Sequence, residues 1–314
     1  MNSISGKLMC LIIISSFFTA ISFANEVEVN IGEEGDKIYG TLISTGGKTD
    51  EIVIFVSGSG PTDRDGNSLM LPGKNNSLKQ LAEALAENGI ASLRYDKRMI
   101  GQSQGSMTEK DLRFEIYIDD LVKWVAYLRD KGYKSITIAG HSEGSLIGMI
   151  AAKKANADKF ISLVGVGTNA SQTIIEQINK QAPQFAAETQ AILDSLNAGK
   201  TVDNVNPMLA ALFRPGVQPY LISWFKYDPR VEIAKLEIPV LIINGTEDIQ
   251  VPIHNADELN SANPKSRLLI IENMNHVLKE IPAGDQAANM AAYKSLDYDL
   301  PDQLINSMVE FIQE

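Results

Sequence analysis

The stretch SITIAGHSEGSLIGMIAAKK, residues 135–154, decides the fold. It opens with an apolar run typical of a buried strand and ends with small and apolar residues typical of a packed helix. Between them lies GHSEG, residues 140–144. A G-x-S-x-G pentapeptide is a weak signal alone, but between a strand and a helix it indicates the sharp turn called a nucleophile elbow. We therefore predict that Ser142 is a nucleophile raised above the sheet.

Strand-like runs alternate with helical patterns on both sides of this stretch, which favours an α/β class with a mainly parallel sheet. Several runs are continuously apolar, as in strands covered by helices on both faces. The further predicted strands are residues 51–56, 91–96, 160–166, 239–245 and 267–273. Before them, residues 26–31 and 37–44 alternate apolar and polar side chains, which predicts an antiparallel hairpin. In the helix that follows residue 76, Ser77 is the predicted capping residue.

One segment, about residues 169–230, breaks the alternation because it holds helical patterns and no convincing strand. It is too long for a simple connection, so we predict a helical cap inserted into the main domain. Seven of its apolar side chains are candidates for a pocket near the predicted nucleophile, although each is also a candidate for the cap's own core. They are Leu209, Leu212, Phe213, Tyr220, Leu221, Trp224 and Phe225.

The bulk properties exclude several classes of protein. The 314 residues carry a net charge of -11, so a nucleic-acid partner would be repelled. Cys10 is the only cysteine and lies near the amino terminus. The rest of the chain therefore has no disulfide, cysteine nucleophile or zinc-thiolate site.

Residues 1–24 have the pattern of a secretory signal peptide. Lys7 precedes an apolar stretch, and Ser22 and Ala24 supply small side chains at the positions that a signal peptidase reads. The alternative is an uncleaved anchor, since the apolar stretch is near the lower limit for crossing a bilayer. We expect an exported protein, periplasmic or secreted, whose mature domain spans residues 25–314.

A serine nucleophile needs a base, and the chain offers three histidines. His141 lies inside the elbow, where we expect its side chain to point away from the reaction centre. His254 stands at what looks like a helix start. His276 follows the last apolar strand, where a loop can bring its imidazole over the carboxyl edge of the sheet. We therefore predict His276 as the base.

The base in turn needs a carboxylate that fixes its tautomer. Glu247 and Asp248 both follow the strand at 239–245. Asp248 is preferred because its shorter side chain defines the geometry more tightly, and Glu247 is the alternative. The resulting chain order is serine, acid, histidine.

Four stretches carry a resemblance to a known family: SGSGPTDRDGN, YDKRMIGQS, GHSEGS and QPYLISWFKYDP. Together they resemble the α/β-hydrolases, and more narrowly a bacterial group of carboxylesterases and serine-aminopeptidase-like hydrolases. One departure is Met99, where the related pattern usually has glycine after Tyr-Asp-Lys-Arg. This departure concerns the turn at residues 98–101.

The resemblance implies that Ser142 attacks an acyl carbonyl while His276, held by Asp248, shuttles the proton. It implies an oxyanion hole made by the backbone N–H of Glu143 and an N–H from the loop after the strand at 51–56. It requires no metal and no organic cofactor. The expected substrates are small esters with short to medium acyl chains.

Other activities compete with this interpretation. An aminopeptidase, an amidase or a thioesterase would use the same three residues. A peptidase would need cap carboxylates facing the pocket, for which Glu176, Glu188 and Asp194 are candidates. Outside this class, the chain could be a non-catalytic small-molecule-binding protein on a hydrolase fold, but its complete serine, acid and histidine set argues against that.

The loop VSGSGPTDRDGN, residues 56–67, raises three interpretations. A calcium loop is disfavoured because the glycine comes too early and the closing glutamate is missing. A phosphate cradle is disfavoured because its lysine and hydroxyl are absent. We instead predict that the N–H of Ser59, or alternatively of Gly60, completes the oxyanion hole.

The charged residues of this loop are predicted to bracket its turn. Asp63, Arg64 and Asp65 follow the predicted oxyanion donor within six residues. We expect them to pair with Lys97 or Arg98 of the YDKR stretch. On this interpretation Arg64 supports catalysis by ordering the loop.

Overall fold

The computed structural model describes residues 25–45 and 49–314. The predicted signal peptide, residues 1–24, lies outside the described residues. Within the described part, none of the helices has the length and apolar character that crossing a membrane requires.

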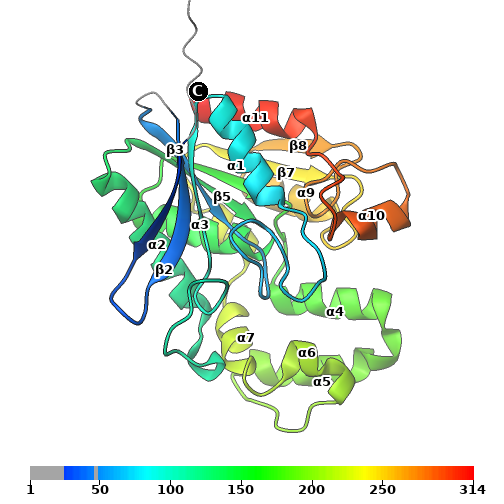
Figure 1. The fold of residues 1–314 in the computed structure, drawn as a ribbon. Coiled ribbons are helices and arrows are strands. Elements are labelled where there is room, and N and C mark those ends of the chain that lie inside the picture. Colours follow the sequence, from blue (N-terminus) through cyan, green and yellow to red (C-terminus); the bar gives the residue numbers. More distant parts are fainter. Residues whose placement is uncertain (1–24, 46–48) are drawn as a thin grey trace, which may run out of the picture.

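A single sheet of eight strands forms the centre of the described structure (Figure 1). Its strands are β1 (Asn25–Ile31), β2 (Ile38–Ser44), β3 (Glu51–Val56), β4 (Ala91–Tyr95), β5 (Ser135–His141), β6 (Lys159–Leu163), β7 (Val240–Gly245) and β8 (Arg267–Ile271). They lie in the order β1-β2-β4-β3-β5-β6-β7-β8. The six strands β3 to β8 are parallel to one another. Strands β1 and β2 form the predicted antiparallel hairpin at one edge, and β2 pairs antiparallel with β4. The α/β class predicted from the sequence is confirmed.

The central strands are apolar throughout because both faces of the sheet are covered. Ile54 of β3 pairs with Leu93 of β4 and Ile138 of β5, and all three are fully buried. Alternate residues of β3 enter different cores: Ile54 packs with the α2 and α3 side, and Val53 packs with the α1 and α11 side. This is the burial expected of a parallel sheet between two helical layers.

Two helical layers flank the sheet (Figure 1). Helices α1 (Ser77–Glu87) and α11 (Asp302–Gln313) contribute to one core. The other core takes side chains from α2 (Phe114–Asp130), α3 (Glu143–Ala155), α8 (Pro229–Ile233) and α9 (His254–Ala262). A short helix, α10 (Gln286–Ala292), belongs to a small separate cluster near the carboxyl terminus.

The prediction that Ser77 caps α1 is wrong. Ser77 is the first helical residue and is buried, while Asn76 before it has a left-handed backbone and gives no side-chain cap. The first N–H of the helix, that of Ser77, donates to Oδ1 of Asn75 at 2.9 Å, and the next two donate to the backbone carbonyl of Asp65, from Leu78 at 3.1 Å and from Lys79 at 3.4 Å. A neighbouring loop thus satisfies donors that a capping side chain would otherwise take.

The segment predicted as a cap forms a layer of helices apart from the sheet (Figure 1). It consists of α4 (Ala170–Gln181), η2 (Pro183–Phe185), α5 (Ala186–Asn197), η3 (Pro207–Leu209), α6 (Ala210–Phe213) and α7 (Gln218–Trp224). These elements lie between β6 and β7 in the chain. The predicted end of the insertion, residue 230, falls inside α8, which packs against α3 and α9 of the main core.

The turn after β4 has a left-handed backbone at Met99, a conformation that methionine disfavours. Met99 has φ of 70°, a conformation that costs a residue with a side chain about 1–2 kcal/mol. The turn is held by hydrogen bonds from the N–H of Met99 to the carbonyl of Ser103 and from the N–H of Ile100 to the carbonyl of Lys97. The backbone of this turn therefore keeps the left-handed conformation that glycine would favour, although the residue is methionine.

Candidate active site

Ser142 lies between β5 and α3 in a turn that few sequences can form. Its backbone has φ 54° and ψ -120°, outside the regions that side-chain-bearing residues ordinarily occupy. A side-chain carbon on Gly140 would lie 2.2 Å from the carbonyl oxygen of Gly144, and one on Gly144 would lie 2.3 Å from that of Val56. Only glycine fits at these two positions. Residues 140–144 thus have the strand, turn and helix geometry of a nucleophile elbow.

Asp248 and His276 meet at the carboxyl edge of the sheet, after β7 and β8. Nδ1 of His276 lies 2.8 Å from Oδ2 of Asp248, and both side chains are almost completely buried. The other carboxylate oxygen accepts from the backbone N–H of Gln250 at 2.8 Å and of Val251 at 2.7 Å. Because the carboxylate is fixed by three hydrogen bonds, it sets the orientation of the imidazole and keeps a proton on Nδ1.

The alternative residues lie elsewhere. The carboxylate of Glu247 accepts from the backbone N–H of Gly284 at 3.0 Å and is turned to another loop. His254 is the first residue of α9, where its Nε2 lies 3.3 Å from the amide nitrogen of Asn255. The structure therefore pairs His276 with Asp248 and leaves both alternatives outside the pair.

His141 has a position that sequence reasoning missed. Its side chain does not point away from the site: its Nε2 lies 2.8 Å from the backbone carbonyl of His276, and the two rings are 5.0 Å apart. Burial, and then the neighbouring His276, lower the pKa of His141 to about 4. The ring is therefore neutral near pH 7, and its Nε2–H donates to the carbonyl. His141 thus ties the loop of His276 to the elbow.

The loop after β3 lies directly against the nucleophile. A side-chain carbon on Gly58 would lie only 3.2 Å from Cβ of Ser142, so glycine is what lets the backbone come this close. Ser59 and Gly60 follow and line the same cavity as Ser142. The loop therefore brings both candidate donor residues to the cavity that Ser142 lines, and the choice of Ser59 over Gly60 stays a prediction at this point.

The second predicted donor is at the start of α3. Glu143 is the first residue of this helix, so its backbone N–H is among those that have no partner within the helix. The positive end of the helix dipole adds to the attraction for an anion there. Glu143 directly follows Ser142, and the role of its N–H as an oxyanion donor stays a prediction at this point.

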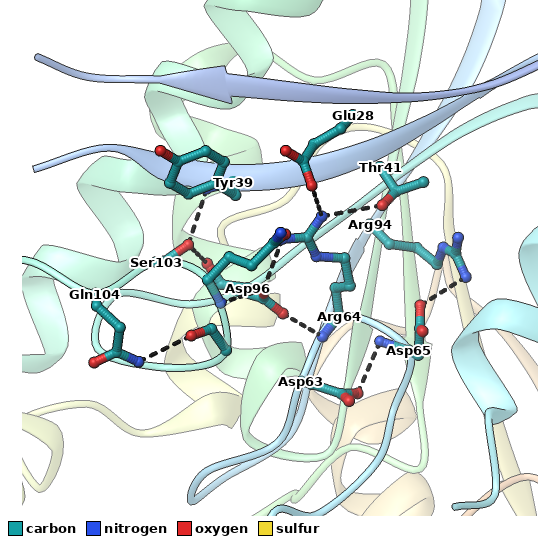
Figure 2. Close-up of polar contacts among 12 residues, drawn as sticks. Glu28, Tyr39, Thr41, Asp63, Arg64, Asp65, Arg94, Asp96, Ser103 and Gln104 are labelled. Carbon is teal, nitrogen blue, oxygen red and sulfur yellow. Dashed lines mark hydrogen bonds and ion pairs between the residues drawn. The ribbon is translucent and has the colours of Figure 1, made fainter. Parts of the chain in front are cut away.

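The charged residues of the loop hold it to the end of β4 (Figure 2). Arg64 donates to the Asp96 carboxylate from its backbone N–H at 2.8 Å and from Nη2 at 2.7 Å, and its Nη1 donates to Thr41 at 3.1 Å. Asp65 forms an ion pair of 2.9 Å with Arg94. The charges thus bracket the turn, as predicted, but with other partners.

The predicted partners Lys97 and Arg98 are wrong. Residues 94 and 96 are two positions apart, so both reach the same side of β4, where the loop lies. Beyond the strand, Lys97 turns towards Glu143, and Arg98 binds the buried carboxylate of Asp120 at 2.8 and 2.9 Å.

The resemblance of this loop to a calcium site has another explanation. The Asp63 carboxylate accepts from the backbone N–H of Asp65 at 3.0 Å and of Asn67 at 2.8 Å, which is the bonding of a turn stabilised by an aspartate side chain. Across residues 25–45 and 49–314, no group of three or more histidine, cysteine, aspartate or glutamate side chains is placed to hold a metal ion.

A buried charged network lies beside the nucleophile, and the sequence reasoning missed it. Nζ of Lys97 donates to the backbone carbonyl of Gly58 at 2.6 Å and to the Glu143 carboxylate at 2.8 Å. The hydroxyl of Tyr220, from α7 of the cap, donates to the other oxygen of Glu143 at 2.6 Å. Burial, and then the Glu143 charge, raise the pKa of Tyr220 well above its usual value, so this hydroxyl keeps its proton. The only sign of this network in the sequence was Glu143, a charged residue inside the elbow.

A cavity of about 710 Å³ opens over Ser142 and is lined by both the main domain and the cap. The predicted pocket residues divide into two sets. Those that line the cavity are Leu212, Tyr220, Leu221 and Trp224. Those that are buried outside its lining are Leu209, Phe213 and Phe225.

The cap carboxylates predicted for a peptidase do not face this cavity. Glu176, Glu188 and Asp194 are exposed and are not among its lining residues. The two carboxylates that do line it are both paired: Glu143 with Lys97, and Glu109 with Arg214, whose Nε donates to it at 3.1 Å. Among the described residues, the cavity therefore offers no unpaired carboxylate.

The strand order, the elbow after β5 and the histidine held by a carboxylate after β7 give this chain the α/β-hydrolase fold. Residues 73–209 match the family described as serine aminopeptidase, S33. The matched part includes Ser142 but ends before Asp248 and His276. A search of curated protein sequences finds no significant match.

Solved structures with the same fold include several esterases. Est1E from Butyrivibrio proteoclasticus, solved with ferulic acid, is 20% identical with a TM-score of 0.61, over 91% of this chain and 100% of that one. The Pyrococcus furiosus esterase Pf2001 is 18% identical with a TM-score of 0.59, over 93% and 91% of the two chains. An esterase from Thermogutta terrifontis is 17% identical with a TM-score of 0.56, over 92% and 98%. At these identities the likeness establishes the fold.

Proposed function

We propose that the protein is a serine hydrolase that cleaves carboxylic esters with short to medium acyl chains. The observation that carries the proposal is the cavity over Ser142, whose lining is largely apolar and whose two carboxylates are already paired. The esterases among the structural neighbours support the same activity.

We infer the reaction from the chemistry of these groups. Ser142 Oγ attacks the ester carbonyl carbon while His276, whose Nδ1 is bonded to Asp248, takes the serine proton on Nε2. The tetrahedral oxyanion accepts from the backbone N–H groups of Glu143 and the 58–60 loop. The C–O bond then breaks, and the leaving alcohol takes the proton from His276. Water next attacks the acyl-enzyme with His276 as base, which releases the acid and restores Ser142.

The charges of the cavity favour an ester over a peptide with a free amino terminus. A cationic amine in such a cavity would need a free carboxylate, because burying an unpaired charge is costly. Glu143 and Glu109 are each held by a cation, so neither offers that charge. A neutral acyl group meets no such cost.

The apolar side of the cavity suits an aliphatic or aromatic acyl group. Leu146, Leu212, Leu221 and Trp224 line it, and its volume lies within the usual range for small-molecule sites, about 300–1,000 Å³. Met70 extends this apolar lining to the protein surface, where its side chain is 76% exposed. A chain of medium length can therefore leave the cavity over an apolar edge.

A substrate panel tests the proposal. Nitrophenyl esters from acetate to decanoate should be compared with aminoacyl anilides and acyl thioesters at one pH, using kcat/KM for each. We expect the esters to exceed the anilides by at least about 100-fold, with an optimum at short or medium chains. Efficient anilide cleavage with weak ester cleavage would make the protein an aminopeptidase, and a preference for thioesters would make it a thioesterase.

We also propose that the protein is exported with cleavage after residue 24. The support is the sequence of residues 1–24, with its lysine, apolar stretch and small residues before Asn25. Intact mass and amino-terminal sequencing of protein recovered from a bacterial host should give Asn25 as the first residue. An intact Met1 in a membrane fraction would indicate an uncleaved anchor instead.

A further inference from the structure

We propose that Lys97 is a positioning residue that fixes both backbone donors of the oxyanion hole. This inference rests on the serine hydrolase activity proposed above. It concerns a side chain that needs no contact with the substrate and acts through the peptide groups that it holds. Two bonds of one ammonium group carry it, one to each segment that supplies a donor.

The first bond sets the direction of the loop donor. Lys97 Nζ donates to the carbonyl oxygen of Gly58 at 2.6 Å. In a trans peptide the C=O of one residue and the N–H of the next point in opposite directions from one rigid plane. Holding the Gly58 oxygen therefore turns the N–H of Ser59 to the other side. Because Gly58 lies against Ser142, this bond favours Ser59 over Gly60 as the donor.

The second bond holds the residue that supplies the other donor. Lys97 Nζ lies 2.8 Å from the carboxylate of Glu143, whose backbone N–H begins α3. The hydroxyl of Tyr220 binds the same carboxylate from the cap at 2.6 Å. One cation thus links the loop after β3 to the elbow after β5, and the cap helix α7 closes over the link.

Burial makes this link rigid. The side chains of Lys97 and Glu143 are 1% and 3% exposed, so water competes little for their bonds. The Lys97 ammonium also lies 4.9 Å from the ring centre of Tyr117, a favourable cation–π contact. Preorganised donors stabilise a transition state only when they are already in place, and a misplacement of about 1 Å can cost about 100-fold in rate.

The test must separate positioning from simple charge balance. Lys97→Met alone would leave Glu143 buried and unpaired, which can unfold a protein. The double variant Lys97→Met/Glu143→Gln avoids this, because it removes one charge of each sign and leaves the backbone N–H of residue 143 in place. The new glutamine oxygen can still accept from Tyr220. Glu143→Gln alone keeps the bond from Lys97 to Gly58.

The readout is a trifluoromethyl ketone labelled with ¹³C at its carbonyl carbon, which forms a hemiketal with Ser142. Titration of its ¹³C shift gives the acidity of the hemiketal hydroxyl, and this acidity reports how well the hole stabilises an oxyanion. For the double variant we expect the acid dissociation constant to fall at least about 10-fold and kcat about 10- to 100-fold, with KM changed less than about threefold. Glu143→Gln should instead make the hemiketal more acidic than in the wild type, because Lys97 still holds the Gly58 carbonyl while a negative charge beside the oxyanion is gone.

A neighbouring buried ion pair serves as the matched control. Arg98 binds Asp120 and, unlike Lys97, does not line the cavity. Arg98→Met/Asp120→Asn should lower the midpoint of thermal unfolding without changing the hemiketal acidity. A fall in acidity there equal to that of the Lys97 double variant would assign the effect to lost packing and overturn the proposal.

The outcomes distinguish this inference from the activity on which it rests. If the wild type forms no hemiketal, the serine hydrolase activity fails and the role of Lys97 falls with it. If the wild type forms one and the double variant is equally acidic and equally fast, Lys97 only balances the Glu143 charge. The activity proposed above would then stand while the positioning role is rejected.

Discussion

The floor and the cap of the cavity are built from different interactions. On the floor, Ser142 and Lys97 line the cavity just beyond strand ends, and Lys97 and His276 are held by short polar bonds to segments that are distant in the chain. On the cap, apolar side chains such as Leu212 line the space and remain partly open to solvent.

This difference suggests how the work is divided. A group fixed by several buried hydrogen bonds keeps one orientation, which is what positioning of reacting atoms requires. An apolar wall has no preferred direction and accepts any group of fitting volume. We therefore expect substitutions on the floor to change kcat and substitutions on the cap to change the preference among acyl chains.

The largest expected effect is at the carboxylate that holds the base. In Asp248→Asn the amide nitrogen would donate to Nδ1 of His276 and leave the proton on Nε2, where it prevents the ring from accepting from Ser142. We expect kcat to fall by about 10⁴-fold with the fold intact. Glu247→Gln is the matched control and should keep wild-type kcat. Equal losses in both variants would contradict the assignment of Asp248.

The next effect concerns Arg64, which holds the loop after β3 to Asp96 and lies outside the cavity (Figure 2). Arg64→Met leaves Asp96, which is 3% exposed, without its guanidinium partner. We expect a loss of about 3–5 kcal/mol in the free energy of unfolding, together with a lower kcat. Lys154→Met, which removes a solvent-exposed pair with Asp119, should cost less than about 1 kcal/mol. Urea unfolding and initial rates would measure both, and wild-type turnover in Arg64→Met would refute the role in ordering the loop.

A third effect is the loss of stability at acid pH that is expected from the buried His141 on the floor side. His141 has a pKa of about 4 in the folded chain, lowered by burial, against about 6.5 when unfolded. Because the unfolded state binds the proton first, the stabilisation is present above pH 6.5 and is lost as the pH falls from 6.5 to 4. Between pH 7.5 and 4.5 we expect this residue to account for about 2–3 kcal/mol of lost stability.

The variant His141→Gln isolates that contribution. Its amide can still donate to the carbonyl of His276, but it does not titrate. Urea unfolding at the two pH values should therefore give a smaller acid loss in the variant than in the wild type. Identical pH dependence in the two proteins would show that His141 is not held neutral by the fold.

The smallest effect is expected on the cap. Leu212→Ala enlarges the cavity at a side chain that is 41% exposed. We expect the ratio of kcat/KM between octanoyl and butyryl esters to change up to about 10-fold, with stability changed by less than about 0.5 kcal/mol. Phe213→Leu, a buried position outside the lining, should instead cost about 1 kcal/mol and leave the ratio unchanged. The reverse pattern would assign Leu212 to the core of the cap.

Much of the fold could be predicted because its signals are local. The apolar runs of β3 to β8, the alternation of β1 and β2 and the glycines around Ser142 each act within a few residues. The positions of Asp248 and His276 were predictable for a related reason. The carboxyl ends of parallel strands share one edge of the sheet, so residues that follow such strands gather there.

The contacts that could not be predicted join distant segments through side chains. Lys97 was expected to meet the charges of the loop at 63–65, yet it meets Glu143, while Arg64 takes Asp96. Each charge had several partners of opposite sign nearby in the sequence, and the choice among them depends on where the folded chain brings distant segments together. His141 was misplaced because the turn at Ser142 directs its neighbour towards the loop of His276.

One measurement tests the central claim most directly: covalent labelling of the folded protein by a fluorophosphonate, followed by intact mass and peptide mapping. The account predicts a single adduct on Ser142, and none in Ser142→Ala, with both proteins giving the same circular dichroism. A folded wild type that takes no label, or a Ser142→Ala variant that is labelled equally, would contradict it.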